Sequence, residues 1–205
     1  MLVKICGITR REDARAAVES GARALGFVFW PRSPRFIDPY RARAVVATLP
    51  PFVTAVGLFV NQPAEYVTGV ASLVKLGAVQ LHGDEPIAFA ETIRHPLVKA
   101  LTLKDDIRRW PGRMTVLLDA HDPEQRGGTG RTIDWSAAAV VAARRPILLA
   151  GGLTPENVAE AVARVHPFGI DVSSGVERSP GIKDHNKIKA LFEALHAISD
   201  VTARS

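Results

Sequence analysis

The 205-residue sequence predicts a (β/α)8 TIM barrel, one compact domain over residues 1–205 with a frayed tail over about 199–205. Apolar runs of strand length recur eight times, and most intervals between them can hold a helix. Strands alternating with helices indicate a parallel sheet, which most simply closes into a barrel at eight strands. The alternative is an open doubly wound sheet, but the first strand-to-helix turn, "ICGITRRE", lacks the G-x-G-x-x-G pattern.

The expected strands are short and rich in Val, Ile, Leu or Phe, as buried parallel strands are. In chain order they are "VKICGI" (3–8), "ALGFVF" (24–29), "TAVGLFV" (54–60), "AVQLHG" (78–83), "LVKALTL" (97–103), "TVLLDA" (115–120), "PILLAGG" (146–152) and "GIDVSSG" (169–175).

Helix start and stop signals fill the intervals. "REDARAAVESGA" is amphipathic with an acidic start, and "DPYRARAVVATL" opens with Asp38 as N-cap and Pro39 behind it. "QPAEYVTGVASLVKLG" is expected to begin in the same way and to stop at Gly77. "LTPENVAEAVARV" has Thr154 as its cap, and "DHNKIKALFEALHAI" is the last helix. "KDDIRRWPGR" has room only for a short helix.

Composition excludes several classes of protein. Hydrophobic residues make up 47% of the chain, which is typical of a globular protein. No apolar run approaches the roughly 18–20 residues of a membrane span, and no signal peptide is recognisable, so we expect no membrane partner. The single cysteine cannot form an internal disulfide, which fits a cytoplasmic protein. The scattered histidines have no zinc-site spacing, so we expect no metal.

The net charge of +5 suits either nucleic acid or a small anionic substrate. The basic residues are spread along the chain, and the densest cluster, "RRW" with Arg113 nearby, is short. We therefore expect no nucleic-acid partner.

Polar residues recur on one face of several expected strands, because side chains alternate between faces. Lys4 and Cys6 share a face of the first strand, Gln80 and His82 a face of the fourth, and Asp171 and Ser173 a face of the eighth. Asp119 lies near the end of the sixth strand and Lys99 within the fifth. A lone polar residue in a strand is usually a satisfied core group. Several at the same strand ends favour a shared site at the carboxyl face of a barrel.

Glycine-rich turns follow the seventh and eighth strands. Gly151 and Gly152 precede a helix in "LLAGGLTPEN", and Ser173, Ser174 and Gly175 end the last strand in "DVSSGVE". Exposed backbone N–H groups at such turns bind phosphate, although glycine also simply stops strands. The segment "QRGGTGRTIDW" is rich in glycine, so residues 125–131 form either a lid over the site or simply a flexible loop.

These segments together resemble the phosphoribosylanthranilate isomerase family. The resemblance runs in order through "KICGIT", "ESGARALGFVF", "SPRFI", "VGLFVN", "VQLHGDE", "LLDA", "GGTGRTIDW", "LAGGLTPENV" and "IDVSSGVERSPGIKD". It implies a (β/α)8 barrel and an Amadori rearrangement of a phosphorylated small molecule, N-(5-phosphoribosyl)anthranilate, in tryptophan biosynthesis. It implies no cofactor and leaves a monomer or a homodimer open.

The resemblance also suggests roles for the catalytic pair. Cys6 matches the general base and Asp119 the general acid, whereas Asp122 is not singled out. Because a thiolate is the active form of a cysteine base, we expect Lys4 to depress the pKa of Cys6. The alternative for Lys4 is an ion pair with Asp171. Asp119 must hold its proton near neutral pH, which requires burial or a neighbouring negative charge.

Further residues are expected to bind the substrate. Arg35 in "WPRSPRF" looks like the clamp for the anthranilate carboxylate, with Arg32 as its competitor. Gln80 and His82 either line the floor of the site or are core polar groups. Asp171 looks like a partner of a substrate hydroxyl or of Lys4, and Trp30 is a candidate for an aromatic wall.

Two other functions compete with this hypothesis. A related ribose-phosphate isomerase of histidine biosynthesis would have an aspartate at the end of the first strand, where this chain has Cys6. A non-catalytic phosphate-binding barrel would be indicated by the loss of Cys6 or Asp119, and both are present.

Overall fold

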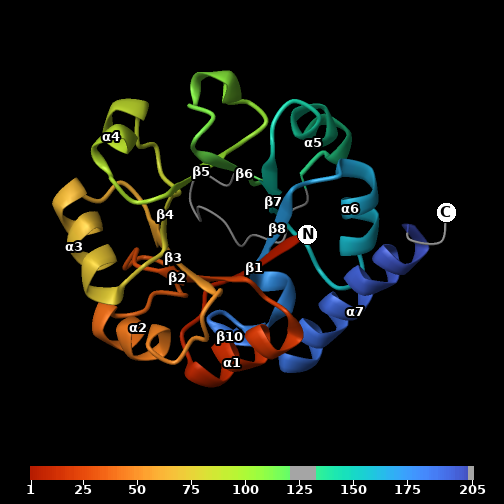
Figure 1. The fold of residues 1–205 in the computed structure, drawn as a ribbon, viewed down its shortest axis with the longest axis horizontal. Helices are drawn as coiled ribbons and strands as arrows, with labels where there is room; N and C mark the ends of the chain where they lie inside the picture. Colours follow the sequence, from red (N-terminus) through yellow and green to blue (C-terminus); the bar gives the residue numbers. More distant parts are fainter. Residues whose placement is uncertain (121–132, 203–205) are drawn as a thin grey trace.

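A computed structural model describes residues 1–120 and 133–202. Strands β1 to β8 form a closed parallel barrel in the order of the chain, and a ring of helices surrounds it (Figure 1). The predicted barrel is therefore confirmed. The strands are β1 (Leu2–Cys6), β2 (Ala24–Val28), β3 (Thr54–Phe59), β4 (Ala78–Leu81), β5 (Leu97–Leu101), β6 (Thr115–Leu118), β7 (Ile147–Leu149) and β8 (Gly169–Val172).

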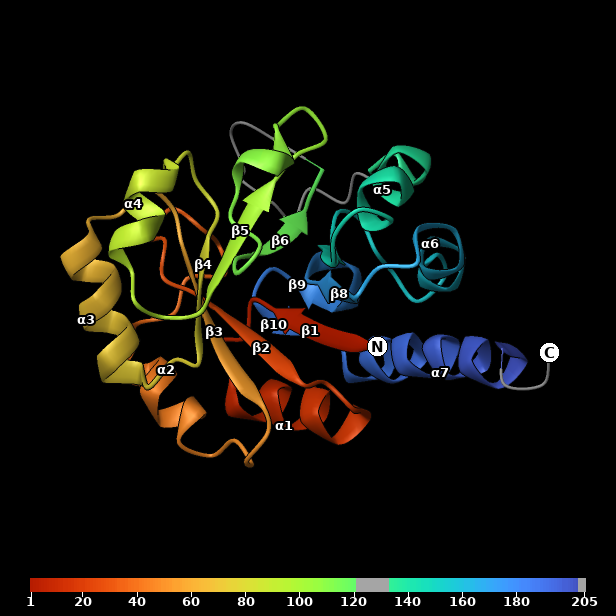
Figure 2. The same cartoon turned by 45° about the horizontal axis from the view of Figure 1, so that its top comes forward.

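The helices of the ring follow the strands in turn. They are α1 (Arg11–Ser20), α2 (Pro39–Val46), α3 (Ala64–Val74), α4 (Ile87–Thr92), α5 (Trp135–Ala142), α6 (Val158–Val165) and α7 (His185–Thr202), with the short 3-10 helices η1 (Ile107–Arg109) and η2 (Ser174–Val176). Helix α7 lies beside α1 and α6 and carries the chain away from the barrel (Figure 2). The tail expected over about 199–205 thus begins inside a helix, and residues 203–205 lie outside the described part.

Local sequence signals explain where several helices begin and end. The Asp38 carboxylate accepts hydrogen bonds from the backbone N–H groups of Tyr40 and Arg41, as expected of the N-cap of α2. Gly21 ends α1 in the left-handed conformation, where a side chain would be strained. Helix η1 is the short helix expected between β5 and β6.

Two helix boundaries differ from the sequence expectation. Helix α3 ends at Val74 with Lys75 at φ 63° as its C-cap, and does not continue to Gly77. The Gly77 N–H instead bonds to Ala55 O in the loop that leads into β4. Helix α6 begins at Val158, because Thr154 opens a turn in which the Asn157 side chain accepts from the Thr154 N–H.

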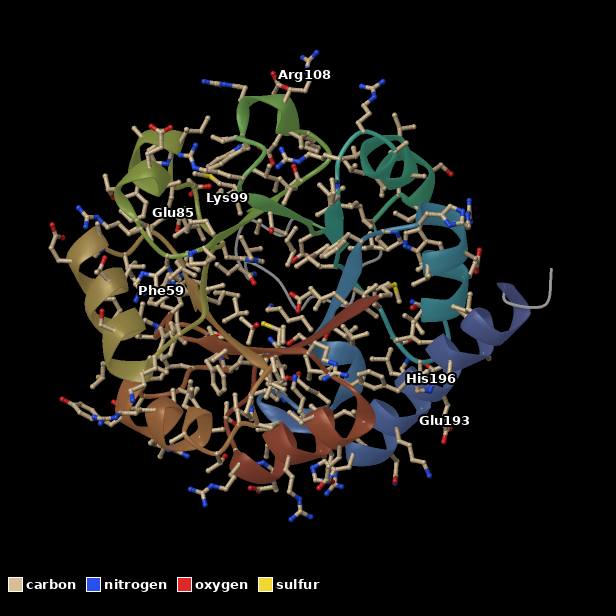
Figure 3. All side chains as sticks on the ribbon, viewed as in Figure 1. Phe59, Glu85, Lys99, Arg108, Glu193 and His196 are labelled. Atoms are coloured by element: carbon tan, nitrogen blue, oxygen red, sulfur yellow. The ribbon has the colours of Figure 1, made fainter. Side chains whose placement is uncertain are left out.

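The core has an outer layer and an interior. Most buried apolar side chains, Phe59 among them, pack between the strands and the helices (Figure 3). Smaller apolar clusters fill the barrel itself, such as Ala24 with Val56 and Ala78. Because successive strand residues alternate between these two environments, each strand presents one face to the interior and to the mouth above it.

A two-stranded antiparallel hairpin follows β8 and was not anticipated from the sequence. It consists of β9 (Glu177–Ser179) and β10 (Ile182–Lys183), with Gly181 at φ 78° in its turn. The Lys183 N–H bonds to Asp13 Oδ2 on α1, and the Thr9 hydroxyl donates to Gly181 O. The hairpin is therefore fastened to the loop after β1 and to the first helix.

Candidate active site

A cavity opens at the carboxyl ends of the strands and brings most of the predicted site residues together. Its lining contains Cys6, Arg35, Gln80, His82, Asp119, Gly151, Gly152, Asp171, Ser173 and Ser174. Trp30, the candidate aromatic wall, lies in the same lining. Lys4 and Gly175 are the predicted residues outside it. The strands thus gather into one place side chains that are far apart in the sequence.

Lys4 lies below the cavity floor and is fully buried. Its Nζ donates a 2.8 Å hydrogen bond to Asp171 Oδ1, and the two residues are register partners in β1 and β8. Burial lowers the pKa of Lys4, but the charges of Asp171 and Cys6 outweigh it, so the pKa lies above its ordinary value. Of the two roles considered for Lys4, the structure contains the ion pair with Asp171.

Cys6 ends β1 and its thiol is buried against glycine. Its register partner is Gly26 in β2, where an added Cβ would lie 2.7 Å from Cys6 Sγ. Sequence analysis missed Gly26, since a glycine inside a strand gives no sign of the side chain it accommodates.

The expectation of a depressed Cys6 pKa is wrong. Burial raises the pKa of the Cys6 thiol above its ordinary value, and this effect exceeds the lowering by the Lys4 and Lys183 charges. Asp171 adds to the rise, because its negative charge disfavours a thiolate. Lys4 therefore acts in the expected direction but is too weak to reverse the effect of burial.

Gln80, His82 and Asp119 form a chain of contacts across the mouth of the barrel. Gln80 Nε2 lies 2.9 Å from His82 Nδ1, and His82 Nε2 lies 3.5 Å from Asp119 Oδ2. A Gln80 amide that donates to Nδ1 leaves the proton of a neutral His82 on Nε2, facing Asp119. Gln80 Oε1 is buried without a hydrogen-bond partner in the described part of the chain. Gln80 and His82 thus contact each other and line the cavity.

Arg35 reaches the cavity from the loop after β2. Its Nε and Nη2 donate to Glu177 Oε1 and Oε2 at 3.0 and 2.8 Å, a two-pronged ion pair. Glu177 stands within the quoted segment "DVSSGVERSPGIKD", but only the hairpin β9–β10 reveals that it faces Arg35. Arg32, the competitor, stacks on the Trp30 ring at 5.5 Å and is absent from the cavity lining.

The expected phosphate turns lie side by side on the cavity wall. Gly151 and Gly152 have φ of 84° and 61°, a left-handed stretch that only glycine adopts easily, and Asn157 Nδ2 holds the turn through Gly152 O. Gly175 lies outside the cavity lining, and its packing explains why a glycine is needed there. A Cβ there would lie 1.9 Å from Leu153 O, so its lack of a side chain lets the two turns touch.

Lys99 and Glu85 form a further buried ion pair beyond this cavity. Lys99 Nζ donates to Glu85 Oε2 at 2.8 Å and to Gly83 O, and both side chains lie between β4 and β5 (Figure 3). They line a neighbouring cavity that shares His82 and Asp119 with the first. Lys99 therefore lines the neighbouring cavity and is not one of the polar residues from β1, β4, β6 and β8 that line the first cavity.

The remaining expectations concern the loop after β6, a metal site and membrane-spanning helices. The lid of residues 125–131 and Asp122 lie outside the described residues. Among the residues described, no group of His, Cys, Asp and Glu side chains has the arrangement of a metal site. The described helices also include none with the length and hydropathy needed to cross a membrane.

Fold and site together define a (β/α)8-barrel enzyme with a thiol and a carboxyl group in one cavity at its carboxyl face. Residues 3–194 match the family model of N-(5'-phosphoribosyl)anthranilate isomerase. The chain is 50% identical over 194 residues to the isomerase of Geobacter sulfurreducens, covering 93% of this chain and 96% of that protein. The chain belongs to the N-(5'-phosphoribosyl)anthranilate isomerase family.

Solved structures agree with this assignment. The crystal structure of phosphoribosyl anthranilate isomerase from Thermotoga maritima superposes with a TM-score of 0.89 at 46% identity, covering 96% of this chain and 100% of that one. A second crystal structure contains reduced 1-(o-carboxyphenylamino)-1-deoxyribulose 5-phosphate. It superposes with a TM-score of 0.85 at 44% identity, covering 96% of this chain and all of that one.

Proposed function

We propose that this chain catalyses the Amadori rearrangement of N-(5-phosphoribosyl)anthranilate to 1-(2-carboxyphenylamino)-1-deoxyribulose 5-phosphate, with Cys6 as general base and Asp119 as general acid. This is the isomerase reaction of tryptophan biosynthesis that the family's name describes. The observation that carries the assignment is one cavity lined by both the Cys6 thiol and the Asp119 carboxyl group.

The first chemical step opens the furanose ring. Asp119 gives its proton to the ring oxygen as the C1′–O bond breaks, and the nitrogen lone pair completes an iminium ion. His82 Nε2 lies 3.5 Å from Oδ2 of the same carboxyl group. A positioned acid lowers the barrier because the leaving oxygen does not have to depart as an alkoxide.

The second step moves a proton from C2′. The Cys6 thiolate takes this proton, the C–H electrons form the enamine, and the enamine tautomerises to the ketone. Burial raises the pKa of Cys6 and so disfavours the thiolate. The positive iminium formed in the first step favours it at the moment when the base is needed. The raised thiol pKa is therefore compatible with the role of Cys6.

The two ends of the substrate are placed by different parts of the cavity. The turns at Gly151, Gly152, Ser173 and Ser174 offer backbone N–H groups and hydroxyls to the phosphate. Arg35 offers a planar guanidinium to the anthranilate carboxylate. Asp171, which shares one oxygen with Lys4, has a second oxygen for a substrate hydroxyl.

We expect the enzyme to work in the cytoplasm, as its single buried cysteine suits a reducing compartment. Both a monomer and a homodimer fit this chain, in which Phe52 and Phe168 are 91% and 57% exposed just before β3 and β8. The Thermotoga maritima relative is described as dimeric. Light scattering on the purified chain distinguishes the two states.

The direct test follows the fluorescence of N-(5-phosphoribosyl)anthranilate made in situ. Wild type should consume it, whereas Cys6→Ser and Asp119→Asn should each lose about 10²–10⁴-fold in kcat while remaining folded. Glu193→Gln, on the exposed side of α7, is the matched control for a lost carboxylate. Full activity of Asp119→Asn would remove the acid assignment.

A further inference from the structure

The Arg35–Glu177 ion pair uses only part of the guanidinium. Glu177 takes the side formed by Nε and Nη2, and both side chains are nearly buried, at 12% and 5% exposure. Nη1 has no hydrogen-bond partner among the described residues. Because a guanidinium carries five N–H bonds in one plane, the end formed by Nη1 and the second proton of Nη2 remains a complete fork. Arg35 is also one of the residues that line the cavity.

Glu177 is itself held in place from the opposite side. Lys183 Nζ donates to Glu177 Oε1 at 2.9 Å and to Ser173 O at 3.1 Å, and the Gly181 N–H donates to the same Oε1. Burial raises the pKa of Glu177, but the hydrogen bond from Arg35 and the Lys183 charge bring it below its ordinary value. Glu177 therefore presents a fixed, charged carboxylate to Arg35.

The aliphatic part of Arg35 is confined as well. Gly7 follows Cys6 at φ 78°, and an added Cβ there would lie 2.7 Å from Arg35 Cδ. The Arg35 stem thus lies against the backbone that carries the catalytic thiol. A flexible surface arginine would instead lose rotamer entropy each time it bound a carboxylate.

We infer that Glu177 is a positioning residue that fixes the plane of Arg35, so that the free end of the guanidinium selects a planar aromatic carboxylate in the cavity. The inference rests on the proposed role of Arg35. It means that the hairpin β9–β10, which carries Glu177, helps to determine which ligands the enzyme binds. A purely structural Glu177 would stabilise the loop without distinguishing one ligand from another. The two roles therefore differ in their effect on ligand selectivity.

The test compares two stable ligands. One is reduced 1-(o-carboxyphenylamino)-1-deoxyribulose 5-phosphate, and the other is its counterpart made from aniline, which lacks only the carboxylate. Calorimetry gives the Kd of each, and the ratio of the two measures selectivity for the carboxylate. Glu177→Gln should reduce this ratio by about 10- to 100-fold, the effect of a lost charge-assisted hydrogen bond. Its Kd for the carboxylate-free ligand should stay within about threefold of wild type.

Companion variants separate the failure of this inference from the failure of the proposed function. Arg35→Ala should reduce the ratio at least as far as Glu177→Gln, and the double variant should lose no more than Arg35→Ala. Glu177→Asp, which keeps the charge, should retain part of the selectivity. Glu85→Gln, which breaks the buried ion pair with Lys99 in the neighbouring cavity, is the matched control and should leave the ratio unchanged.

Each outcome decides the question. An unchanged ratio in Glu177→Gln with a reduced ratio in Arg35→Ala overturns the inference alone. An unchanged ratio in Arg35→Ala removes the carboxylate role of Arg35 and the inference with it. Equal weakening of both ligands by Glu177→Gln, or loss of folding in both Glu177 variants by circular dichroism, assigns Glu177 a structural role and also overturns the inference.

Discussion

Lys4 Nζ donates to Asp171 Oδ1 at 2.8 Å, directly across the ladder that closes the barrel between β1 and β8. The pair lies immediately below Cys6 and neutralises the lysine nearest to the thiol. A charge that is already paired stabilises a thiolate less than a free one. The pairing thus weakens the effect of Lys4, and burial, the largest influence on the thiol, raises the pKa of Cys6.

Breaking this pair should destabilise the fold. Lys4→Met leaves the Asp171 carboxylate without its partner near the barrel interior, and we expect a loss of roughly 3–5 kcal/mol in the free energy of unfolding. Lys4→Met/Asp171→Leu should recover most of that loss, because no unpaired charge remains. Urea denaturation of the three proteins measures both values. Equal stability of Lys4→Met and wild type would show that the pair contributes nothing.

The Cys6 thiol should titrate above the ordinary value of about 8.5. Because Cys6 is the only cysteine, the difference in thiolate absorbance between wild type and Cys6→Ser reports this group alone. We expect kcat/KM of wild type to rise from neutral towards alkaline pH, since the reactive thiolate gains population as the pH approaches the raised pKa. A titration midpoint below about 8.5 contradicts this prediction and restores Lys4 as the dominant influence.

Gly26 should be essential for the position of the thiol. A Cβ at Gly26 would lie 2.7 Å from Cys6 Sγ and 3.0 Å from Cys6 Cα, so Gly26→Ala must displace the base. We expect a loss of about 1–3 kcal/mol in stability and about 10²-fold in kcat. Gly69→Ala is the matched control, because no atom lies within 4 Å of its added Cβ in α3. This control should be slightly stabilising, and a harmless Gly26→Ala would contradict the packing argument.

When the His82 imidazole is neutral, its single N–H proton should be on Nε2. Gln80 Nε2 donates to Nδ1, which leaves Nε2 to face Asp119 Oδ2. Nitrogen-15 NMR of the imidazole distinguishes the two tautomers directly. Gln80→Leu removes the donor and should allow the other tautomer to appear. A wild-type protein with its proton on Nδ1 would mean that the Gln80 amide is reversed.

Asp13 should contribute stability that disappears in acid. Burial raises the pKa of Asp13, but hydrogen bonds from Arg10, His185 and the Lys183 N–H bring it below its ordinary value. A folded-state pKa below the unfolded value gives stability that is present above about pH 3.9 and lost as the pH falls through the lower folded pKa.

The variant Asp13→Asn tests this dependence. It should cost about 1–3 kcal/mol at neutral pH, because a buried carboxylate and its hydrogen bonds are lost. Its stability should approach that of wild type below about pH 4. Glu12→Gln, at the exposed neighbouring position of α1, should change stability by less than about 0.5 kcal/mol. A difference between Asp13→Asn and wild type that is independent of pH would contradict the assignment.

The sequence by itself determined the barrel and the location of its site. Runs such as "VKICGI" and "GIDVSSG" identify buried parallel strands because side-chain periodicity and helix caps are local properties. The same alternation places Cys6, Gln80 and Asp171 on one face, and parallel strands bring their carboxyl ends together. Thr154 and Gly77 did not mark the helix ends expected of them. Helix ends depend on which partner each terminal backbone N–H bonds to in the folded chain.

Only the tertiary structure decided the partners and charge states of these residues. Asp171 is 167 positions from Lys4, and Glu177 is 142 positions from Arg35, so no local pattern links either pair. Whether the Cys6 pKa rises or falls depends on the balance between burial and the Lys4, Asp171 and Lys183 charges, which exists only after the barrel closes. Local chemistry thus specifies which groups reach the mouth of the barrel, and packing over long separations sets their electrostatics.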